Sequence, residues 1–190
     1  MNWACDVNAS KRVITTPHAP SVRLSAPRTA DTGPYRILVI GSESADVVRS
    51  VGGWICDRAL SGWRVTVALR DTTDTEPIVI LGAKPIPFEA FAQDLSNGLW
   101  PCALAIAADI FAEDSKVDRL LSSCRREDLP DVMVWGESPQ AANAHLGDDE
   151  QHMSSRAARA FKAHALVAVG IPPHAAEDTE LLHRVRLAGR

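Results

Sequence analysis

The stretch 35–69 constrains the fold of this chain more than any other, because it carries the boundary signals of one complete β-α-β unit. An apolar run, Tyr-Arg-Ile-Leu-Val-Ile, ends at Gly41, and Ser42 and Ser44 then offer hydroxyl groups that commonly cap the start of a helix. Apolar residues recur at helical spacing as far as Gly62, and a second apolar run follows at once. Parallel strands need a crossover, and the crossover here is a helix, so the sequence predicts an α/β fold.

The 190 residues divide into two parts. Residues 1–34 are rich in Pro, Ser, Thr and Ala without a sustained period, which predicts a mobile, disordered N-terminal tail. Residues 35–190 are expected to form a single α/β domain. Hydrophobic residues make up 46% of the chain, yet no apolar run approaches the ~20 residues of a membrane helix, and the start lacks a secretory signal. We therefore expect no membrane association and a cytoplasmic protein.

The sheet is predicted to be mixed and four-stranded. Its strands, numbered along the chain, are 35–40, 64–69, 77–81 and 131–135, in the order 3-2-1-4. The connection before 77–81 is too short for a helix, so that strand is expected to return antiparallel. Elsewhere we predict helices over 44–61, from 101 onward, over 153–169 and over 177–186, and a loop over 143–151. The expected result is a small Rossmann-like three-layer domain.

The core of this domain is predicted from the same pattern. Strand residues Val39, Ile40, Val67, Val132 and Val134 should be deeply buried, because central strands between helix layers have no route to water. On the helices, Val51, Ile55 and Phe161 should pack on the sheet faces. The glycine pair Gly52-Gly53 inside the first helix suggests a close approach of that helix to the sheet.

A ligand crevice is predicted where the first and fourth strands of this order lie side by side. Open α/β sheets bind ligands where neighbouring connections leave in opposite directions. The free N–H groups of a helix start could hold an anion or a nucleotide phosphate there. Against this, the stretch lacks the glycines of a dinucleotide fingerprint, and Glu43 adds a negative charge; plain helix capping is the competing explanation. The predicted ligand residues are Gly41, Ser42, Ser44, Gly136, Glu137 and Ser138.

A thiol switch is a second hypothesis. Cys124 precedes Arg125 and Arg126, and adjacent cations lower a thiol pKa and favour the reactive thiolate. Cys5, in the predicted tail, could then trap an oxidised Cys124 as a disulfide. The alternative is that Cys124, like the other helix cysteines, is a small buried apolar residue.

Catalytic, cofactor and metal signatures are not found. The sequence has no Gly-x-Ser-x-Gly elbow, no His-Glu-x-x-His and no phosphate loop, so we predict no catalytic residues, no cofactor and no metal site. His145 and His152 bracket acidic residues, but a solvated acidic loop explains that cluster equally well. Residues 35–150 carry an excess of acidic side chains, which argues against direct nucleic acid binding.

These observations favour a binding module over an enzyme. The leading hypothesis is a non-enzymatic regulatory module that acts through a protein partner, with bacterial transcriptional or stress regulation as its setting; a homo-oligomer is left open. The stretches 52–63, 77–82 and 157–166 resemble segments of uncharacterised actinobacterial α/β proteins, and this resemblance covers most of residues 35–169. It implies a bacterial regulatory or accessory protein and brings no defined activity or site residue with it.

Overall fold

The first β-α-β unit forms as the sequence predicts. In the computed structural model, which describes residues 35–97, 100–126, 131–136 and 146–185, β1 (Arg36–Gly41) leads into α1 (Ser44–Leu60) and then β2 (Arg64–Leu69). Strands β1 and β2 pair in parallel, as a helical crossover requires. The predicted strand core is confirmed, since none of its five valine and isoleucine side chains exceeds 2% exposure.

The sheet is larger than predicted. Over the described residues it has seven strands in the order β3-β2-β1-β4-β5-β7-β6. The further strands are β3 (Lys84–Pro87), β4 (Ala103–Ala107), β5 (Asp131–Trp135), β6 (Leu146–Met153) and β7 (Thr179–Val185). Strands β1 to β5 pair in parallel, whereas β7 runs antiparallel to both β5 and β6, so the mixed α/β sheet is confirmed and the count of four strands is wrong.

The predicted antiparallel strand over 77–81 is wrong. That stretch forms the short helix α2 (Glu76–Ile80), with Pro77 in its first turn and Ile78 buried while Val79 is 58% exposed. Pro lacks an N–H donor, a defect that the first turn of a helix tolerates. With α2 serving as a crossover, the third strand moves to Lys84–Pro87 and pairs in parallel with β2.

The predicted helix from residue 101 onward is also wrong at its start. Residues Ala103–Ala107 form β4, which lies between β1 and β5, and only then does α4 (Ala108–Glu113) begin. The run Leu104–Ala107 is buried throughout. A parallel strand covered on both faces shows a continuous apolar run, and an alanine-rich run of that kind also suits a helix.

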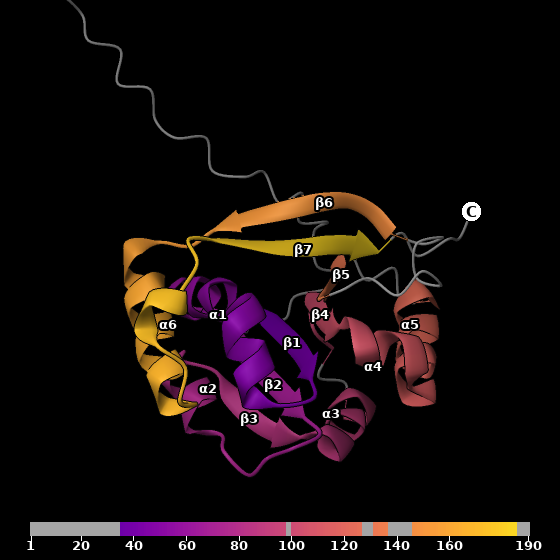
Figure 1. Cartoon of the computed structure of the whole chain (residues 1–190). Helices are drawn as coiled ribbons and strands as arrows, with labels where there is room; N and C mark the ends of the chain where they lie inside the picture. Colours follow the sequence, from indigo (N-terminus) through magenta and orange to yellow (C-terminus); the bar gives the residue numbers. More distant parts are fainter. Residues whose placement is uncertain (1–34, 98–99, 127–130, 137–145, 186–190) are drawn as a thin grey trace, which may run out of the picture.

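The C-terminal part contributes two strands where we predicted a loop and a short helix. Figure 1 shows β6 and β7 as long neighbouring arrows that extend across the sheet. Between them lie α6 (Arg156–Ala168) and the 3-10 turn η2 (Pro173–Ala175). Strand β6 lies at the sheet edge, where few of its side chains need to be apolar. Its polar sequence therefore lacks the apolar pattern by which a strand is predicted.

Helices form two groups around the sheet. Helices α1, α2 and α6 pack against one another on one side, while α3 (Phe91–Ser96), α4 and α5 (Ser115–Arg126) lie on the other side of the sheet in Figure 1. The 3-10 turn η1 (Phe88–Ala90) leads into α3. This arrangement confirms a layered α/β fold. Residues 1–34, the predicted tail, lie outside the described residues.

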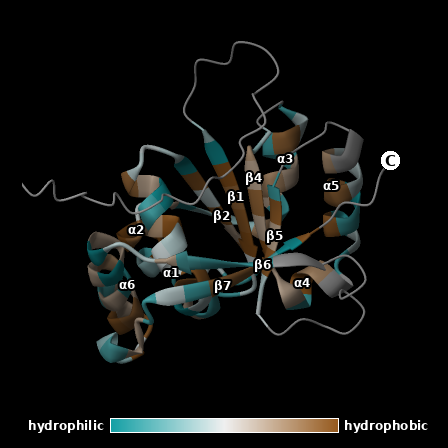
Figure 2. Cartoon of the chain, turned by 90° about the horizontal axis from the view of Figure 1, so that it is seen from above, coloured by the Kyte–Doolittle hydropathy of each residue, from teal (hydrophilic) through white to brown (hydrophobic). Residues whose placement is uncertain are grey.

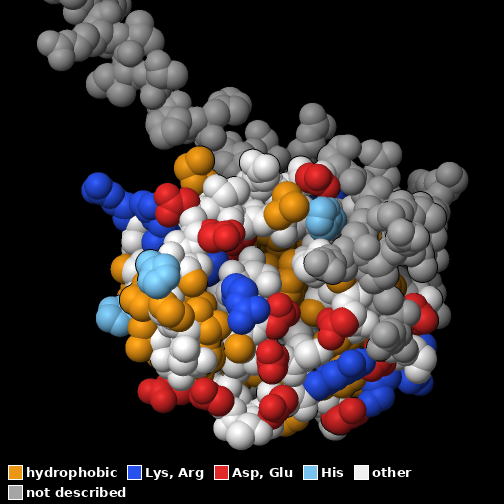
Figure 3. All heavy atoms as spheres, in the orientation of Figure 1, with side chains coloured by type: hydrophobic (Ala, Val, Ile, Leu, Met, Phe, Trp, Pro, Cys, Tyr) orange, Lys and Arg blue, Asp and Glu red, His pale blue; other side chains and the backbone are white. Residues whose placement is uncertain are grey.

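Helix α6 turns a different face inward from the one predicted. Its buried residues include Ala158, Lys162 and Leu166, whereas Phe161 is 43% exposed and does not pack on the sheet. Figure 3 shows hydrophobic side chains gathered over α6 at one side of the molecule. The faces of an alanine-rich helix differ little in hydrophobicity, so the sequence does not indicate clearly which face is buried. Here the face that carries Lys162 is buried, because Lys162 pairs with Glu180.

That ion pair belongs to the Glu180 cluster, made of Glu180, Lys162, Gly53 and Trp54. The carboxylate of Glu180 on β7 accepts hydrogen bonds from the backbone N–H groups of Gly53 and Trp54, each at 2.7 Å, and from Lys162 Nζ at 2.6 Å. The side chains of Lys162 and Glu180 are 0% and 2% exposed. The cluster therefore joins α1, α6 and β7 inside the protein.

Gly53 makes this approach sterically feasible. A Cβ atom at this position would lie 2.0 Å from Ser154 Oγ and 3.1 Å from Glu180 Oε1. At Gly52, a Cβ atom would meet Leu81 and Lys162 at 3.4 Å. The glycine pair does allow a close approach, but mainly to α6, to Ser154 beside its start and to Leu81 after α2. Glu180 on β7 is the contact from the sheet.

Removing the carboxylate should expose the role of the Glu180 cluster. We expect Glu180→Ala to lower the free energy of unfolding by about 3–5 kcal/mol, because it leaves the buried Lys162 ammonium without its carboxylate partner. Urea denaturation followed by circular dichroism measures this change. The control, Glu177→Ala, removes an exposed carboxylate nearby and should stay within about 0.5 kcal/mol of wild type. Equal stability of the two variants would contradict the role given to Glu180.

Candidate functional site

Polar side chains gather where β1 and β4 end. The chain leaves β1 toward β2 on one side and leaves β4 toward β5 on the other, which makes this edge the switch point of the sheet. Ser42 follows β1, and Asp109 is the second residue of α4. The hydroxyl of Ser42 donates to Asp109 Oδ2 at 2.7 Å. This pair joins the two sides of the switch point.

Trp135 fills the crevice that the sequence predicted between Gly41 and Gly136. Strand β4 separates β1 from β5, and the indole of Trp135, 1% exposed, covers Gly41. A Cβ atom on Gly41 would lie 3.6 Å from Trp135 Cζ2 and 2.4 Å from Val47 Cγ2. The indole Nε1 donates to Asp46 Oδ2 at 3.0 Å. Glycine at position 41 thus allows Val47 and Trp135 to pack against the end of β1, and the indole N–H of Trp135 orients the Asp46 carboxylate.

The first turn of α1 also faces this edge. Glu43, the N-cap residue, makes no side-chain cap hydrogen bond among the described residues. Ser44 does not cap the helix either, since its hydroxyl donates to the backbone carbonyl of Asp74. The backbone N–H groups of Ser44, Ala45 and Asp46 find no acceptor within the described part of the chain. Within the described residues these three donors are unpaired, and such donors at a helix start can bind an electron-rich oxygen.

Arg70 supplies the cation of this edge. Its Nη2 donates to Asp114 Oδ2 at 2.9 Å, and its guanidinium lies 5.5 Å from the ring of Phe88. Asp114 also accepts from the backbone N–H of Lys116 at 2.8 Å. Burial on its own would raise the pKa of Asp114, but the Lys116 N–H and the Arg70 guanidinium together hold that pKa below its ordinary value. Asp114 therefore stays ionised, and Arg70 stays fixed beside it.

We call this region the β1/β4 rim and define it by Ser42, Asp46, Arg70, Asp109 and Asp114. Its formal charge is negative, because it contains three carboxylates and one guanidinium, and only Asp114 is paired with Arg70 in the described residues. Asp71, next to Arg70, adds a further carboxylate, whose pKa is lowered by hydrogen bonds from the hydroxyl and the N–H of Thr73. A rim of this charge disfavours a phosphate and favours an uncharged or cationic molecule.

The predicted ligand residues are only partly brought together. Gly41, Ser42 and Ser44 lie at the rim, and Gly136 is exposed at the end of β5 with a φ of 97°. Glu137 and Ser138 lie outside the described residues. Sequence reasoning missed Asp109 because β4 was interpreted as a helix. The signal that could have found Asp109 and Arg70 is their position directly after buried apolar runs.

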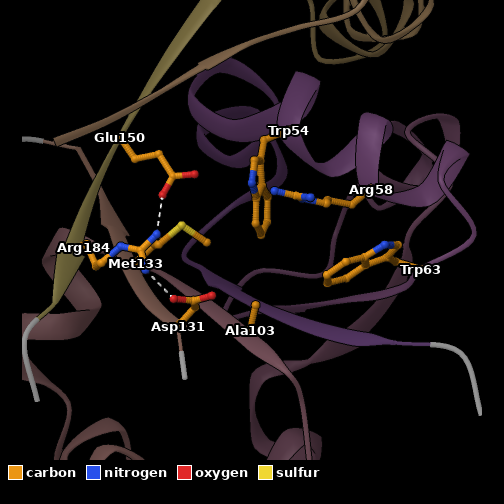
Figure 4. Close-up of a pocket in the computed structure, with 8 residues that line it drawn as sticks. All are labelled: Trp54, Arg58, Trp63, Ala103, Asp131, Met133, Glu150 and Arg184. Carbon is orange, nitrogen blue, oxygen red and sulfur yellow. Dashed lines mark hydrogen bonds and ion pairs between the residues drawn. The ribbon is translucent and has the colours of Figure 1, made fainter. Parts of the chain in front are cut away.

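A second cluster at the opposite edge of the sheet is shown in Figure 4. Arg184 on β7 donates to Asp131 at 2.6 Å and to Glu150 at 2.8 Å, and the guanidinium of Arg58 lies 5.6 Å from the Trp54 ring and 5.2 Å from the Trp63 ring. The cavity between them has a volume of about 10 Å³, room for about one water molecule. Burial raises the pKa of Asp131, although Arg184 opposes this effect. We interpret this cluster as structural.

The described residues form neither a metal-binding cluster nor a membrane-spanning helix. No group of three or more His, Cys, Asp or Glu side chains there is arranged to hold a metal ion. None of the described helices combines the length and apolar composition that a membrane crossing requires.

Comparisons with known proteins identify the fold. No protein-family model and no characterised protein matches the sequence. Among solved structures, the A40926 pseudoaglycone deacetylase Dbv21 superposes with a TM-score of 0.56 at 17% identity, over 83% of this chain and 100% of that one. A deacetylase of teicoplanin biosynthesis, in complex with teicoplanin, gives 0.56 at 12% identity, over 82% of this chain and 100% of that one. GalB, the 4-carboxy-2-hydroxymuconate hydratase from Pseudomonas putida, gives 0.55 at 13% identity, over 82% and 97%.

These likenesses correct the functional hypothesis. At such identities they show a shared fold, and the proteins that share it are deacetylases and a hydratase. The prediction of a non-enzymatic regulatory module that works through protein association is therefore wrong.

The thiol-switch hypothesis is also wrong. It assumed a regulatory protein, whereas the similar solved structures are enzymes, and the burial of Cys124 opposes it as well. Cys124 is 1% exposed, and burial raises its pKa to about 11, the opposite of the lowered pKa that the switch needs. Burial likewise raises the pKa of Cys56 to about 11, with Asp57 and Glu180 adding to the effect. Cys5 lies outside the described residues. The alternative, small buried apolar cysteines, fits Cys56 and Cys124, while Cys102 is half-buried.

Alkylation should separate these cysteines. With iodoacetamide at pH 8, we expect Cys102 to react in the folded protein while Cys56 and Cys124 stay unmodified, because a pKa of about 11 leaves a thiolate fraction roughly a hundredfold below that of an ordinary thiol. Peptide mass spectrometry over a time course measures each site. In urea all three should react at similar rates. Native alkylation of Cys124 as fast as Cys102 would contradict its burial.

Proposed function

We propose that this protein is an enzyme that adds water to a small polar substrate, with hydrolytic removal of an acyl group from an amine as its reaction. Deacetylation and hydration, the activities named for the proteins of similar fold, both add the elements of water to a substrate. The observation that carries the proposal is the hydrogen bond between Ser42 and Asp109 at the switch point of the sheet.

Asp109 is the general base of this proposal. The carboxylate of Asp109 accepts a hydrogen bond from the Ser42 hydroxyl at 2.7 Å. It is therefore placed to take a proton from a water molecule beside Ser42. The water oxygen then bonds to the acyl carbon, the C–N bond breaks, and the proton passes from Asp109 to the departing amine. Ser42 is a positioning residue, since its hydroxyl orients the carboxylate and the water.

The start of α1 would stabilise the oxyanion that forms during this attack. The N–H groups of Ser44, Ala45 and Asp46 have no acceptor within the described residues, and the helix dipole places partial positive charge there. The side chain of Asp46 does not compete for these donors, because its two oxygens accept from Ser50 and Trp135.

The charge of the β1/β4 rim supports deacylation over hydration of a carboxylate. Three rim carboxylates would repel an anionic substrate, whereas they stabilise the ammonium that deacylation releases. Carboxylates also bind sugar hydroxyl groups well. We therefore propose an N-acylated, uncharged, hydroxyl-rich substrate such as an acylated aminosugar.

An acetate-release assay tests this proposal. The full chain is incubated with a panel that contains N-acetylglucosamine and teicoplanin, and freed acetate and freed amine are both measured. We expect at least one substrate to be hydrolysed, and Asp109→Asn to lower kcat/KM by about 10²–10⁴-fold, because the variant removes the base. Ser42→Ala should lower kcat more than it changes KM.

The matched control is Glu177→Gln, which removes an exposed carboxylate in the segment before β7, outside the rim. It should retain wild-type kcat/KM, and thermal melting should show all three variants folded. Acetate release that is unchanged in Asp109→Asn, or no release above background from the whole panel, would overturn the proposal.

A further inference from the structure

We propose that a basic groove at the opposite edge of the sheet binds an organic anion with an apolar body. The groove is separate from the β1/β4 rim, because it lies where β1, β2 and β3 begin, whereas the rim lies where β1 and β4 end. It is defined by the cations Arg36, Arg64 and Lys84 and by the side chains that wall it. The proposal does not depend on the enzymatic activity proposed above.

Strand register places the three cations together. Arg36 pairs with Arg64 across β1 and β2, so their side chains project from the same face of the sheet. Lys84 on β3 pairs with Thr66, which lies two residues beyond Arg64 and therefore on that face too. Figure 2 shows β1 and β2 each with a hydrophilic end, in contrast to their hydrophobic middles. Three adjacent strands thus each contribute one cation.

The charges of the groove are not balanced within the described residues. No ion pair to Arg36, Arg64 or Lys84 is present there, and one carboxylate, Asp94, also lines the groove. The chain as a whole carries a net charge of −4, so a positive patch is not a consequence of composition. Neighbouring cations repel one another, and a bound anion would relieve this repulsion.

The volume and the apolar wall of the groove indicate the size and the apolar part of its ligand. The volume of the groove is about 290 Å³, near the lower end of the range for small-molecule sites. The groove lies beside α3, whose Phe91 and Leu95 form one wall. Leu38 and Pro101 complete the apolar surface. A neutral polar ligand would leave the cations unmatched, and a bare inorganic ion would leave the apolar wall unused.

The ligand class is therefore a carboxylate or phosphate monoester with a short apolar chain. Two guanidinium groups on neighbouring strands suit a planar carboxylate or a phosphate, since each presents several N–H donors in a fixed fork. Lys84 adds a third positive charge beside them. The apolar chain would lie along Phe91 and Leu95.

Isothermal titration calorimetry with matched probes tests this inference on the full chain. The probes are octanoate, octyl phosphate, octanol and inorganic phosphate. The two anionic amphiphiles are used below the concentrations at which they form micelles, and octanol is used below its solubility limit. We expect saturable 1:1 binding of octanoate or octyl phosphate, weakened by at least tenfold in Arg36→Gln/Arg64→Gln and weakened by added salt. The two anionic probes distinguish a carboxylate head from a phosphate head.

The control is Arg49→Gln/Arg119→Gln, which removes two exposed arginines on α1 and α5 and should leave binding unchanged. Thermal melting establishes that both double variants fold. Octanol binding as tightly as the anionic probes, inorganic phosphate binding as tightly as octyl phosphate, or equal affinity in the two double variants would overturn the inference. None of these readouts depends on acetate release, so failure here and failure of the proposed activity are distinguishable.

Discussion

The carboxylate of Glu180 is the contact on which the arrangement of the chain depends. It connects residues more than a hundred positions apart, because it accepts from Gly53 and Trp54 inside α1 and from Lys162 on α6. Without this acceptor, α6 would have to leave a buried ammonium uncompensated. The contact therefore fixes β7 and α6 against the N-terminal β-α-β unit. Strand β7 can then extend the parallel sheet by an antiparallel pairing with β5.

The chemistry of the molecule lies just beyond its buried strands. The central strands have apolar side chains on both faces, so the first positions free to carry polar groups are those that follow them. Ser42 follows β1, Arg70 follows β2, and Asp109 comes shortly after β4. Because parallel strands end at one edge, residues distant in sequence meet there. The basic groove lies at the other ends of the strands, since its three cations are the first residues of β1, β2 and β3.

The sequence predicted those elements whose boundaries are marked by glycine or by clear periodicity. The unit 35–69 and the strand 131–135 are present, as is the last long helix, although its inward face differs from the predicted one. The stretches 77–81 and 103–107 were misassigned because short apolar runs suit both helix and strand, and burial by distant segments decides between them. The sequence directs attention to the end of β1, where the proposed site lies, but Asp109 could be placed there only once β4 was known to be a strand. The Glu180 cluster has no local signal, because its partners are brought together by the complete fold.

The two edge strands of the sheet have features that oppose pairing with strands of other molecules. An outer strand exposes unpaired N–H and C=O groups, which can template further strands. Strand β3, at one edge, has the sequence Lys-Pro-Ile-Pro, and its two prolines offer no N–H for such pairing. Strand β6, at the other edge, carries the charged residues Asp149 and Glu150 and has an irregular register against β7. The two edge strands of the described sheet thus carry different features that oppose pairing with a further strand.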